Sequence, residues 1–191
     1  MWQARFFEND EVDRTGEYPL AGVHMTPEPS SHVSEKVYAY ITQGEQLLVF
    51  RHVDAPEAGI QVPGGTVQPG ESLPEAVLRE AFEETGLADL EIVSALGDTW
   101  FDLAAYERAG EVHHRHVFHL RAAAPLPATW RHVERDPSDG GPPILFEFSW
   151  MPLAQAPDLL IAEMGALAHL IGLRPGRPGA SGKLPNPGGQ Q

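Results

Sequence analysis

The 191-residue sequence contains no cysteine. This absence excludes disulfides, thiol nucleophiles, thiolate zinc sites and iron–sulfur clusters. Basic residues are also scarce, because 13 lysines and arginines stand against 27 aspartates and glutamates, which gives a formal net charge of −14. A general nucleic-acid binder needs a basic face that displaces counterions, and an anionic membrane surface attracts basic segments. Neither kind of partner is therefore expected.

Long apolar runs are missing as well. No stretch of 18 apolar residues occurs, so no segment is expected to span a bilayer. The first residues lack the basic region and apolar stretch of a signal peptide. Since 42% of the residues are hydrophobic, we expect a globular protein, soluble and cytoplasmic.

The two ends differ in composition from the middle of the chain. Residues 1–33 mix charges with turn-forming residues and are expected to form an irregular or edge segment. Residues 173–191 contain nine glycines or prolines in 19 positions and are predicted to be a disordered tail. One folded domain is therefore expected over residues 34–172.

The hydrophobic pattern of this domain predicts an α/β fold. Strands are predicted at 37–41 and 47–50, joined by a turn, then at 60–62, 90–96, 99–103, 112–121 and 144–151. A polar loop is predicted at 131–143 and an amphipathic helix at 153–171. Together with the helix described next, this order predicts a mixed β-sheet with helices on both faces.

The clearest predicted helix follows Ser72. Glu75 stands three residues later, which is the spacing of a capping box, and Pro74 falls in the first turn, where a missing N–H costs little. Gly86 is a natural C-terminal stop. Apolar residues recur at helical spacing and comprise Val77, Leu78, Ala81 and Phe82.

Three carboxylates share one face of this helix. Glu80, Glu83 and Glu84 stand at i, i+3 and i+4, where like charges repel unless a cation lies among them. Magnesium prefers such hard oxygen ligands, and Arg79 beside them can orient a carboxylate or a phosphate. Upstream, the Gly64–Gly65 pair allows the backbone to approach a ligand closely. Taken alone, the pattern also fits a solvated acidic helix face.

The whole string resembles the Nudix box of the MutT-like Nudix hydrolases. Its fixed positions are occupied by Gly65, Glu71, Arg79, Glu80, Glu83, Glu84 and Gly86. At average residue frequencies of about 5–7%, seven such matches occur by chance in well under about one chain per million. The resemblance implies a Nudix α/β/α sandwich over residues 34–172. It also implies hydrolysis of a nucleoside diphosphate linked to another moiety, with Mg²⁺ or Mn²⁺ as cofactor.

The resemblance further implies roles for individual residues. The implied metal ligands are Gly64, Glu80, Glu83 and Glu84. The implied supporting residues are Glu71 and Gly65, with Arg79 orienting a glutamate of the box. A metal explains how so acidic a chain binds polyphosphates, because a divalent cation bridges the two sets of anions.

Several acidic residues could act as the general base. Glu80 is the first candidate, and Glu147 is a catalytic candidate because it interrupts an otherwise apolar strand, where it faces either a site or solvent. Further acids that could serve are Glu134, Asp136 and Asp139.

Substrate contacts are expected from Gln61, Arg51 and Arg115. The histidine-rich stretch 113–119 around Arg115 is open to three interpretations: metal binding, substrate contact, or a polar strand face. The expected partner is a small nucleotide, most simply a nucleoside triphosphate or dinucleoside polyphosphate, with nucleotide sugars also open. A homodimer is left open, and the alternative function is a non-catalytic nucleotide-binding or sensor protein with the Nudix fold.

Overall fold

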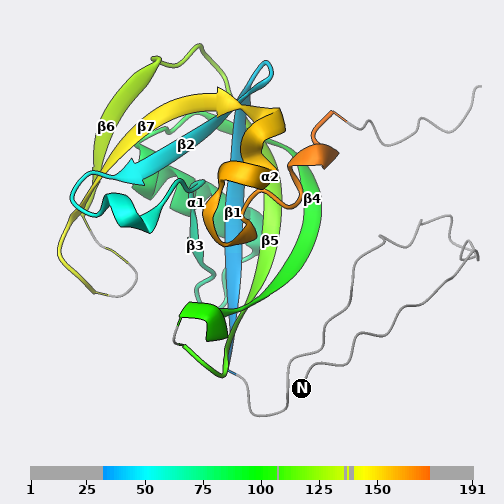
Figure 1. Cartoon of the computed structure of the whole chain (residues 1–191). Helices are drawn as coiled ribbons and strands as arrows, with labels where there is room; N and C mark the ends of the chain where they lie inside the picture. The colour runs from blue at the N-terminus through cyan, green and yellow to red at the C-terminus, as the bar shows by residue number, and fades with distance from the viewer. Residues whose placement is uncertain (1–31, 107, 136, 138–139, 173–191) are drawn as a thin grey trace, which may run out of the picture.

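The computed structural model describes residues 32–106, 108–135, 137 and 140–172 (Figure 1). The predicted tail and almost all of the predicted N-terminal segment therefore lie outside the described residues. The first strand begins at His32, so residues 32 and 33 belong to the sheet.

Within the described residues, seven strands form one mixed sheet. They are β1 (His32–Gln43), β2 (Gln46–His52), β3 (Gly64–Thr66), β4 (Leu90–Asp102), β5 (Glu111–Ala122), β6 (Thr129–Glu134) and β7 (Ile144–Pro152). The order is β4-β5-β1-β2-β7-β6, and β3 pairs with β1. The β1–β5 pair is parallel and the others are antiparallel, so the predicted mixed sheet is confirmed.

The strand β1 shares one of its edges between two partners. Near its end Thr42 pairs with Leu47 of β2, whereas nearer its start Tyr38 pairs with Gly64 of β3. The two strands of the hairpin thus diverge, and the glycine-rich strand β3 fills the gap. This arrangement places the backbone of Gly64 and Gly65 against the middle of the sheet.

The helix α1 (Leu73–Thr85) begins and ends as predicted. Ser72 and Glu75 form both hydrogen bonds of a capping box, and Gly86 takes the left-handed conformation (φ 75°) that ends the helix. Of the predicted apolar stripe, Val77 and Ala81 are buried, whereas Leu78 and Phe82 are 36% and 52% exposed. The buried face instead carries two acids and consists of Ala76, Val77, Glu80, Ala81, Glu84 and Thr85.

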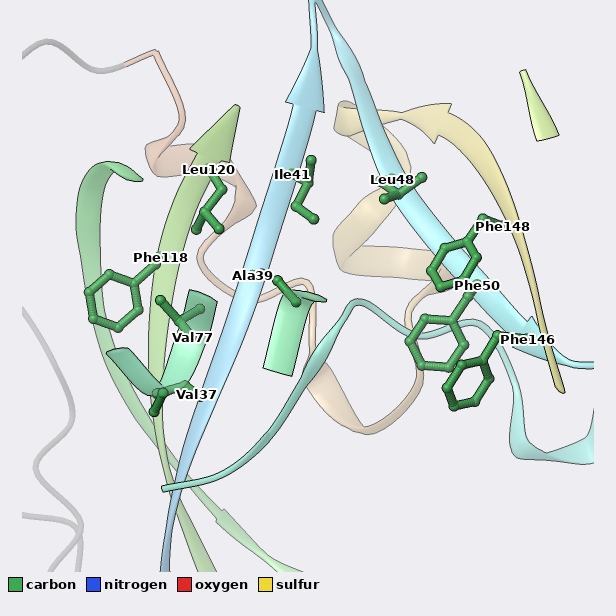
Figure 2. Packing of buried hydrophobic residues seen from close by; sticks show 12 residues of the cluster. Val37, Ala39, Ile41, Leu48, Phe50, Val77, Phe118, Leu120, Phe146 and Phe148 are labelled. Carbon is green, nitrogen blue, oxygen red and sulfur yellow. The ribbon is translucent and has the colours of Figure 1, made fainter. Parts of the chain in front are cut away.

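Two apolar cores lie on opposite faces of the sheet, as the sandwich requires. The first core contains Val77 of α1, side chains of β1, and a group formed by Phe50, Phe146 and Phe148 (Figure 2). The second core, on the other face, contains Tyr40 and Val117 and is covered by the C-terminal segment of the described residues. The predicted fold class is confirmed.

The predicted helix over 153–171 is wrong. The segment is a chain of short turns: η3 (Leu153–Gln155), α2 (Ala156–Leu159), η4 (Ile161–Glu163) and η5 (Ala168–Leu170). Leu160 leaves the helical conformation to bridge to Ile60, and the Ile161 N–H donates to the Ile60 carbonyl at 3.0 Å. These breaks free backbone carbonyls, two of which accept hydrogen bonds from Tyr40 and Arg115 of the sheet.

Other predicted boundaries also change. The predicted loop at 131–143 begins with β6, an edge strand that pairs with β7. The two strands predicted at 90–96 and 99–103 are one strand, β4, with irregular register on either side of Ala95. In place of the strand predicted at 60–62, Ile60 and Gln61 form isolated bridges, and two further single turns are η1 (Pro56–Ala58) and η2 (Leu103–Tyr106). Among the described residues, no helix is long and apolar enough to cross a membrane.

Candidate active site

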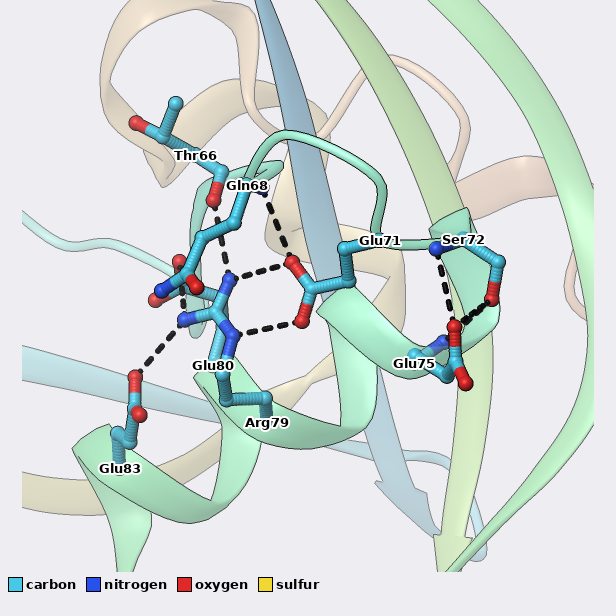
Figure 3. Close-up of polar contacts among 8 residues, drawn as sticks. All are labelled: Thr66, Gln68, Glu71, Ser72, Glu75, Arg79, Glu80 and Glu83. Carbon is cyan, nitrogen blue, oxygen red and sulfur yellow. Dashed lines mark hydrogen bonds and ion pairs between the residues drawn. The ribbon is translucent and has the colours of Figure 1, made fainter.

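Arg79 joins three of the box carboxylates (Figure 3). Its Nε and Nη2 donate to the two carboxylate oxygens of Glu71 at 2.7 and 2.9 Å, which is a bidentate pair. Its Nη1 donates to Glu83 Oε2 at 2.9 Å and lies 3.0 Å from Glu80 Oε1. Nη2 also donates to the Thr66 carbonyl at 3.1 Å. One guanidinium therefore ties the loop before α1 to two consecutive turns of the helix.

The Glu80 carboxylate is buried against the glycine strand. The residue is 2% exposed, and a Cβ on Gly65 would lie 2.2 Å from the Glu80 carboxyl carbon. Only glycine leaves room for that carboxylate at this position. Although Oε1 has the Arg79 guanidinium nearby, it accepts no hydrogen bond of acceptable geometry from any described residue. Burial raises the pKa of Glu80, and the charge of Arg79 only partly opposes this.

Glu84 lies one turn further along the same buried face. Its Oε2 accepts a hydrogen bond from the Gly64 N–H at 2.9 Å, and the residue is 7% exposed. Burial raises its pKa well above the ordinary value, the Gly64 hydrogen bond lowers it, and the negative charge of Glu134 raises it further. Gly64 therefore contacts the box through its N–H, while the resemblance implies a role for its carbonyl.

The residues present fit a divalent cation. Two buried carboxylates, Glu80 and Glu84, and the more exposed Glu83 lie on consecutive turns of α1, and Glu80 Oε1 forms an ion pair with Arg79 at 3.0 Å. The negative charges of Glu80 and Glu83 act on Glu84, and a divalent cation among the three carboxylates would offset this repulsion. Hard carboxylate oxygens are the ligands that Mg²⁺ and Mn²⁺ prefer.

Lys36 is a site neighbour that the sequence did not indicate. It lies on β1 opposite Thr66, and its Nζ donates to the Thr66 hydroxyl. Burial lowers the pKa of Lys36, whereas the negative charge of Glu80 raises it. The pattern of β1 does not reveal this lysine because its place beside the box depends on the pairing of β1 with β3.

Glu134 is the later acid that the fold brings toward the box. It ends β6, is 8% exposed, and acts electrostatically on Glu84. Beside it lies a hollow of about 250 Å³ lined by Phe82, Glu83, His132, Val133, Glu134 and Arg135. The His132 ring lies 3.1 Å from the Glu83 carbonyl, so β6 contacts the C-terminal half of α1. Asp136 and Asp139 lie outside the described residues.

Glu147 and Arg51 are not brought to the box. They are cross-strand neighbours on β7 and β2, and Glu147 accepts two hydrogen bonds from Arg131 of β6 at 2.8 and 3.0 Å. Their side chains alternate with Phe146 and Phe148, which pack toward α1, so they lie on the opposite face. The solvent-facing interpretation of Glu147 is therefore the one that the fold supports.

Arg115 and Gln61 also lie apart from the carboxylates. Arg115 is 3% exposed on the face away from α1, where it donates to the Ala162 carbonyl and stacks 3.8 Å from the Phe101 ring centroid. It therefore fastens the C-terminal segment to the sheet. Gln61 donates to the Ala58 carbonyl at 3.0 Å, which holds a local turn.

Solved structures with the same fold include several Nudix proteins. A MutT protein from Methanosarcina mazei Go1 is 23% identical, with a TM-score of 0.52 over 74% of this chain and 94% of that one. The E. coli ORF135 protein is 21% identical, with a TM-score of 0.52 over 80% of this chain and all of the other. A UDP-X diphosphatase is 19% identical, with a TM-score of 0.52 over 84% of this chain and 65% of that chain. At these identities the likeness concerns the fold.

The sequence comparisons give the family. No curated protein matches the chain. The family model of the NUDIX domain matches residues 34–170, which include α1, the carboxylates of the box and the seven described strands except the first two residues of β1. On this match, and with Glu80 and Glu84 buried beside the glycine-rich strand β3, the chain belongs to the Nudix hydrolases, a family of pyrophosphohydrolases that act on nucleoside diphosphate derivatives.

Proposed function

We propose that this protein hydrolyses the pyrophosphate bond of a nucleoside diphosphate linked to another moiety, in a reaction that requires Mg²⁺, with Mn²⁺ as a substitute. The observation that carries the proposal is the pair of buried carboxylates, Glu80 and Glu84, held by one helix against the glycine strand. An acidic helix face that only contacts solvent would not bury two carboxylates. The most suitable substrates are nucleoside triphosphates and dinucleoside polyphosphates, with nucleotide sugars as a further class.

The proposed ligand set is Glu80, Glu83 and Glu84, with the carbonyl of Gly64 as an additional oxygen. When bound, the divalent cation neutralises the diphosphate and makes its phosphorus more electrophilic. Glu83 is the ligand nearest to solvent, since its side chain is 43% exposed, and it lines the hollow beside β6. The substrate would therefore approach from the side of Glu83.

Two residues position the ligands in this proposal. Arg79 holds Glu83 and Glu80 in place, and Glu71 fixes the orientation of the Arg79 guanidinium through the bidentate pair. Partners of metal ligands typically contribute about 10–100-fold to metal affinity or activity. Both residues therefore act through the carboxylates.

Glu80 is also the proposed acceptor of a proton from the attacking water. Burial raises the pKa of Glu80, and a carboxylate of raised pKa is a better proton acceptor. General-base catalysis requires an acceptor within hydrogen-bond reach of the water. Glu134, close to Glu84, is the second acid that we place at the site, whereas Glu147 has no part in it.

A substrate panel tests the proposal. Nucleoside triphosphates, dinucleoside polyphosphates, ADP-ribose and nucleotide sugars are incubated with Mg²⁺, with Mn²⁺ and with excess EDTA, and the products are separated. We expect hydrolysis of at least one class with metal, no hydrolysis in EDTA, and recovery when Mg²⁺ is restored. Tight nucleotide binding without any hydrolysis would contradict the proposal and favour the non-catalytic alternative, and hydrolysis that EDTA does not affect would contradict the metal requirement.

A further inference from the structure

A second group of metal-binding side chains lies on the sheet and shares no residue with the box. Glu35 of β1 pairs in register with His114 of β5, and His116 follows two residues later on the same face. Glu35 Oε2 lies 3.0 Å from His114 Nδ1 and 2.7 Å from His116 Nε2. One ligand atom from each of the three residues lies within 4.8 Å of the other two. The parallel pairing of β1 with β5 thus brings together residues that are far apart in the sequence.

The ring of His114 lies between two carboxylates. Its Nε2 is 2.9 Å from Asp98 Oδ2 on β4, while its Nδ1 faces Glu35. A neutral imidazole carries one N–H, so only one of these two contacts can be a hydrogen bond. If the proton lies on Nε2 and is donated to Asp98, the lone pair of Nδ1 points at the Glu35 oxygen. The lone pairs of His114 Nδ1 and Glu35 Oε2 would repel each other at 3.0 Å unless a cation, either a second proton or a metal ion, lies between them.

Asp98 and Trp100 hold His114 in the orientation that a metal needs. A metal-bound histidine usually donates its other N–H to a carboxylate, which fixes the tautomer and the ring plane. Asp98 stands in that position, and Trp100 stacks on the His114 ring with 4.1 Å between centroids and 7° between planes. The strand β4 therefore supplies a support for the ring as well as a wall beside it.

The donor set favours a different metal from that of the box. Two imidazole nitrogens and one carboxylate oxygen suit Zn²⁺ and neighbouring transition metals, with bonds of about 2.0–2.2 Å. Such bonds require ligand atoms about 3.3 Å apart. The observed 2.7 and 3.0 Å are shorter than this, so Glu35, whose side chain is 48% exposed, would move away from the two rings on binding. Both imidazoles are more covered, at 19% and 17% exposure, so the carboxylate is the ligand with the most room to adjust.

We propose that Glu35, His114 and His116 bind one divalent transition-metal ion of the Zn²⁺ class, with Asp98 orienting His114, at a site separate from the box. Three protein ligands leave a coordination position for water or for a further group. The ion would link β1 to β5 near their N-terminal ends and thereby stabilise the folded state in proportion to its occupancy. This inference does not depend on the proposed hydrolase activity.

The test is a calorimetric titration of the full chain with Zn²⁺ in excess Mg²⁺, which would compete with Zn²⁺ for the box carboxylates. We expect one Zn²⁺ per chain, and with Co²⁺ the intense visible absorption of a nitrogen-containing site of low coordination number. His116→Ala and Glu35→Gln should each weaken binding at least about 100-fold, and Asp98→Asn about 10–100-fold. His169→Ala is the matched control, because His169 lies on the C-terminal segment, where its Nδ1 is 3.0 Å from the Ala166 carbonyl oxygen, and it is not part of the proposed site.

Two results would overturn the site. One is the absence of any Zn²⁺ binding that survives excess Mg²⁺, which would mean that His114 is held by a proton alone. The other is equal Zn²⁺ affinity in the wild type and in Glu35→Gln, a substitution that keeps the side-chain shape at a half-exposed position. Thermal unfolding of the metal-free variants checks that they fold, and nucleotide hydrolysis in Mg²⁺, measured separately, reports on the box.

Discussion

Replacing Arg79 with lysine tests whether one guanidinium holds the box together. A lysine ammonium is a point charge and cannot reproduce the bidentate pair with Glu71 while also reaching Glu83 and the Thr66 carbonyl. Hydrogen bonds to charged groups are each worth about 1.5–3 kcal/mol when well buried, and exposed ion pairs about 0–1 kcal/mol. The Glu71 side chain is 14% exposed and the Glu83 side chain 43%.

In Arg79→Lys the protein loses one of the two hydrogen bonds to Glu71, the hydrogen bond to the Thr66 carbonyl and most of the ion pair with Glu83. We therefore expect the free energy of unfolding to fall by about 3 kcal/mol. Urea unfolding measures this change, with tryptophan fluorescence as the probe, since Trp130 stacks on Phe148 and donates to the carbonyl of Thr85 in α1. With a slope of about 2 kcal/mol per molar urea, the midpoint falls by about 1.5 M.

The matched control is Arg131→Lys. Arg131 also makes two hydrogen bonds to a glutamate, Glu147, but both side chains are at least half exposed, at 58% and 50%. That substitution should change the free energy of unfolding by less than about 0.5 kcal/mol. If Arg79→Lys costs no more than Arg131→Lys, the Arg79 contacts do not hold the box and the reasoning is refuted.

Three other substitutions probe the structure. Gly65→Ala places a methyl group 2.2 Å from the Glu80 carboxyl carbon, so we expect a loss of about 1–3 kcal/mol in stability together with a loss of turnover; normal turnover would show that this carboxylate need not lie against the glycine. Burial raises the pKa of Tyr40 to about 12. The buried, protonated hydroxyl therefore contributes fully to the free energy of unfolding below pH 10, and this contribution is lost as the pH rises through 12. Alkaline unfolding of the wild type should lose about 2–3 kcal/mol over this range relative to Tyr40→Phe, and equal pH dependence of the two proteins would contradict the assignment. Arg115→Met removes the bond to the Ala162 carbonyl and should lower stability by about 1.5–3 kcal/mol with KM unchanged, whereas a raised KM would restore Arg115 to the substrate site.

The parts of the fold that the sequence predicts are those determined locally. The capping box of Ser72 and Glu75 and the stop at Gly86 define α1 without reference to the rest of the chain. The box itself predicts which carboxylates gather on the helix. It does not predict that Glu80 and Glu84 turn toward the sheet, because this depends on β3 filling the gap beside β1.

The predictions that are wrong concern segments whose structure depends on contacts with distant parts of the chain. The segment 153–171 has helical spacing, but its turns are interrupted where Leu160 bridges to Ile60 and where a carbonyl accepts from Arg115. The strand β6 looks like a polar loop because it is an edge strand, and only its pairing with β7 makes it a strand. The group of Glu35, His114 and His116 likewise forms only through the register of two parallel strands.

The most direct test of the central claim compares Glu83→Gln with Glu147→Gln on the best substrate of the panel, in saturating Mg²⁺. Both glutamates are partly exposed and accept a hydrogen bond from an arginine, but only Glu83 lies on the carboxylate face of α1. We expect Glu83→Gln to lower kcat by more than the roughly 10–100-fold typical of residues that only support metal ligands, and Glu147→Gln to leave kcat within about twofold. Equal activity of the two variants would contradict the assignment of catalysis to the carboxylates of α1.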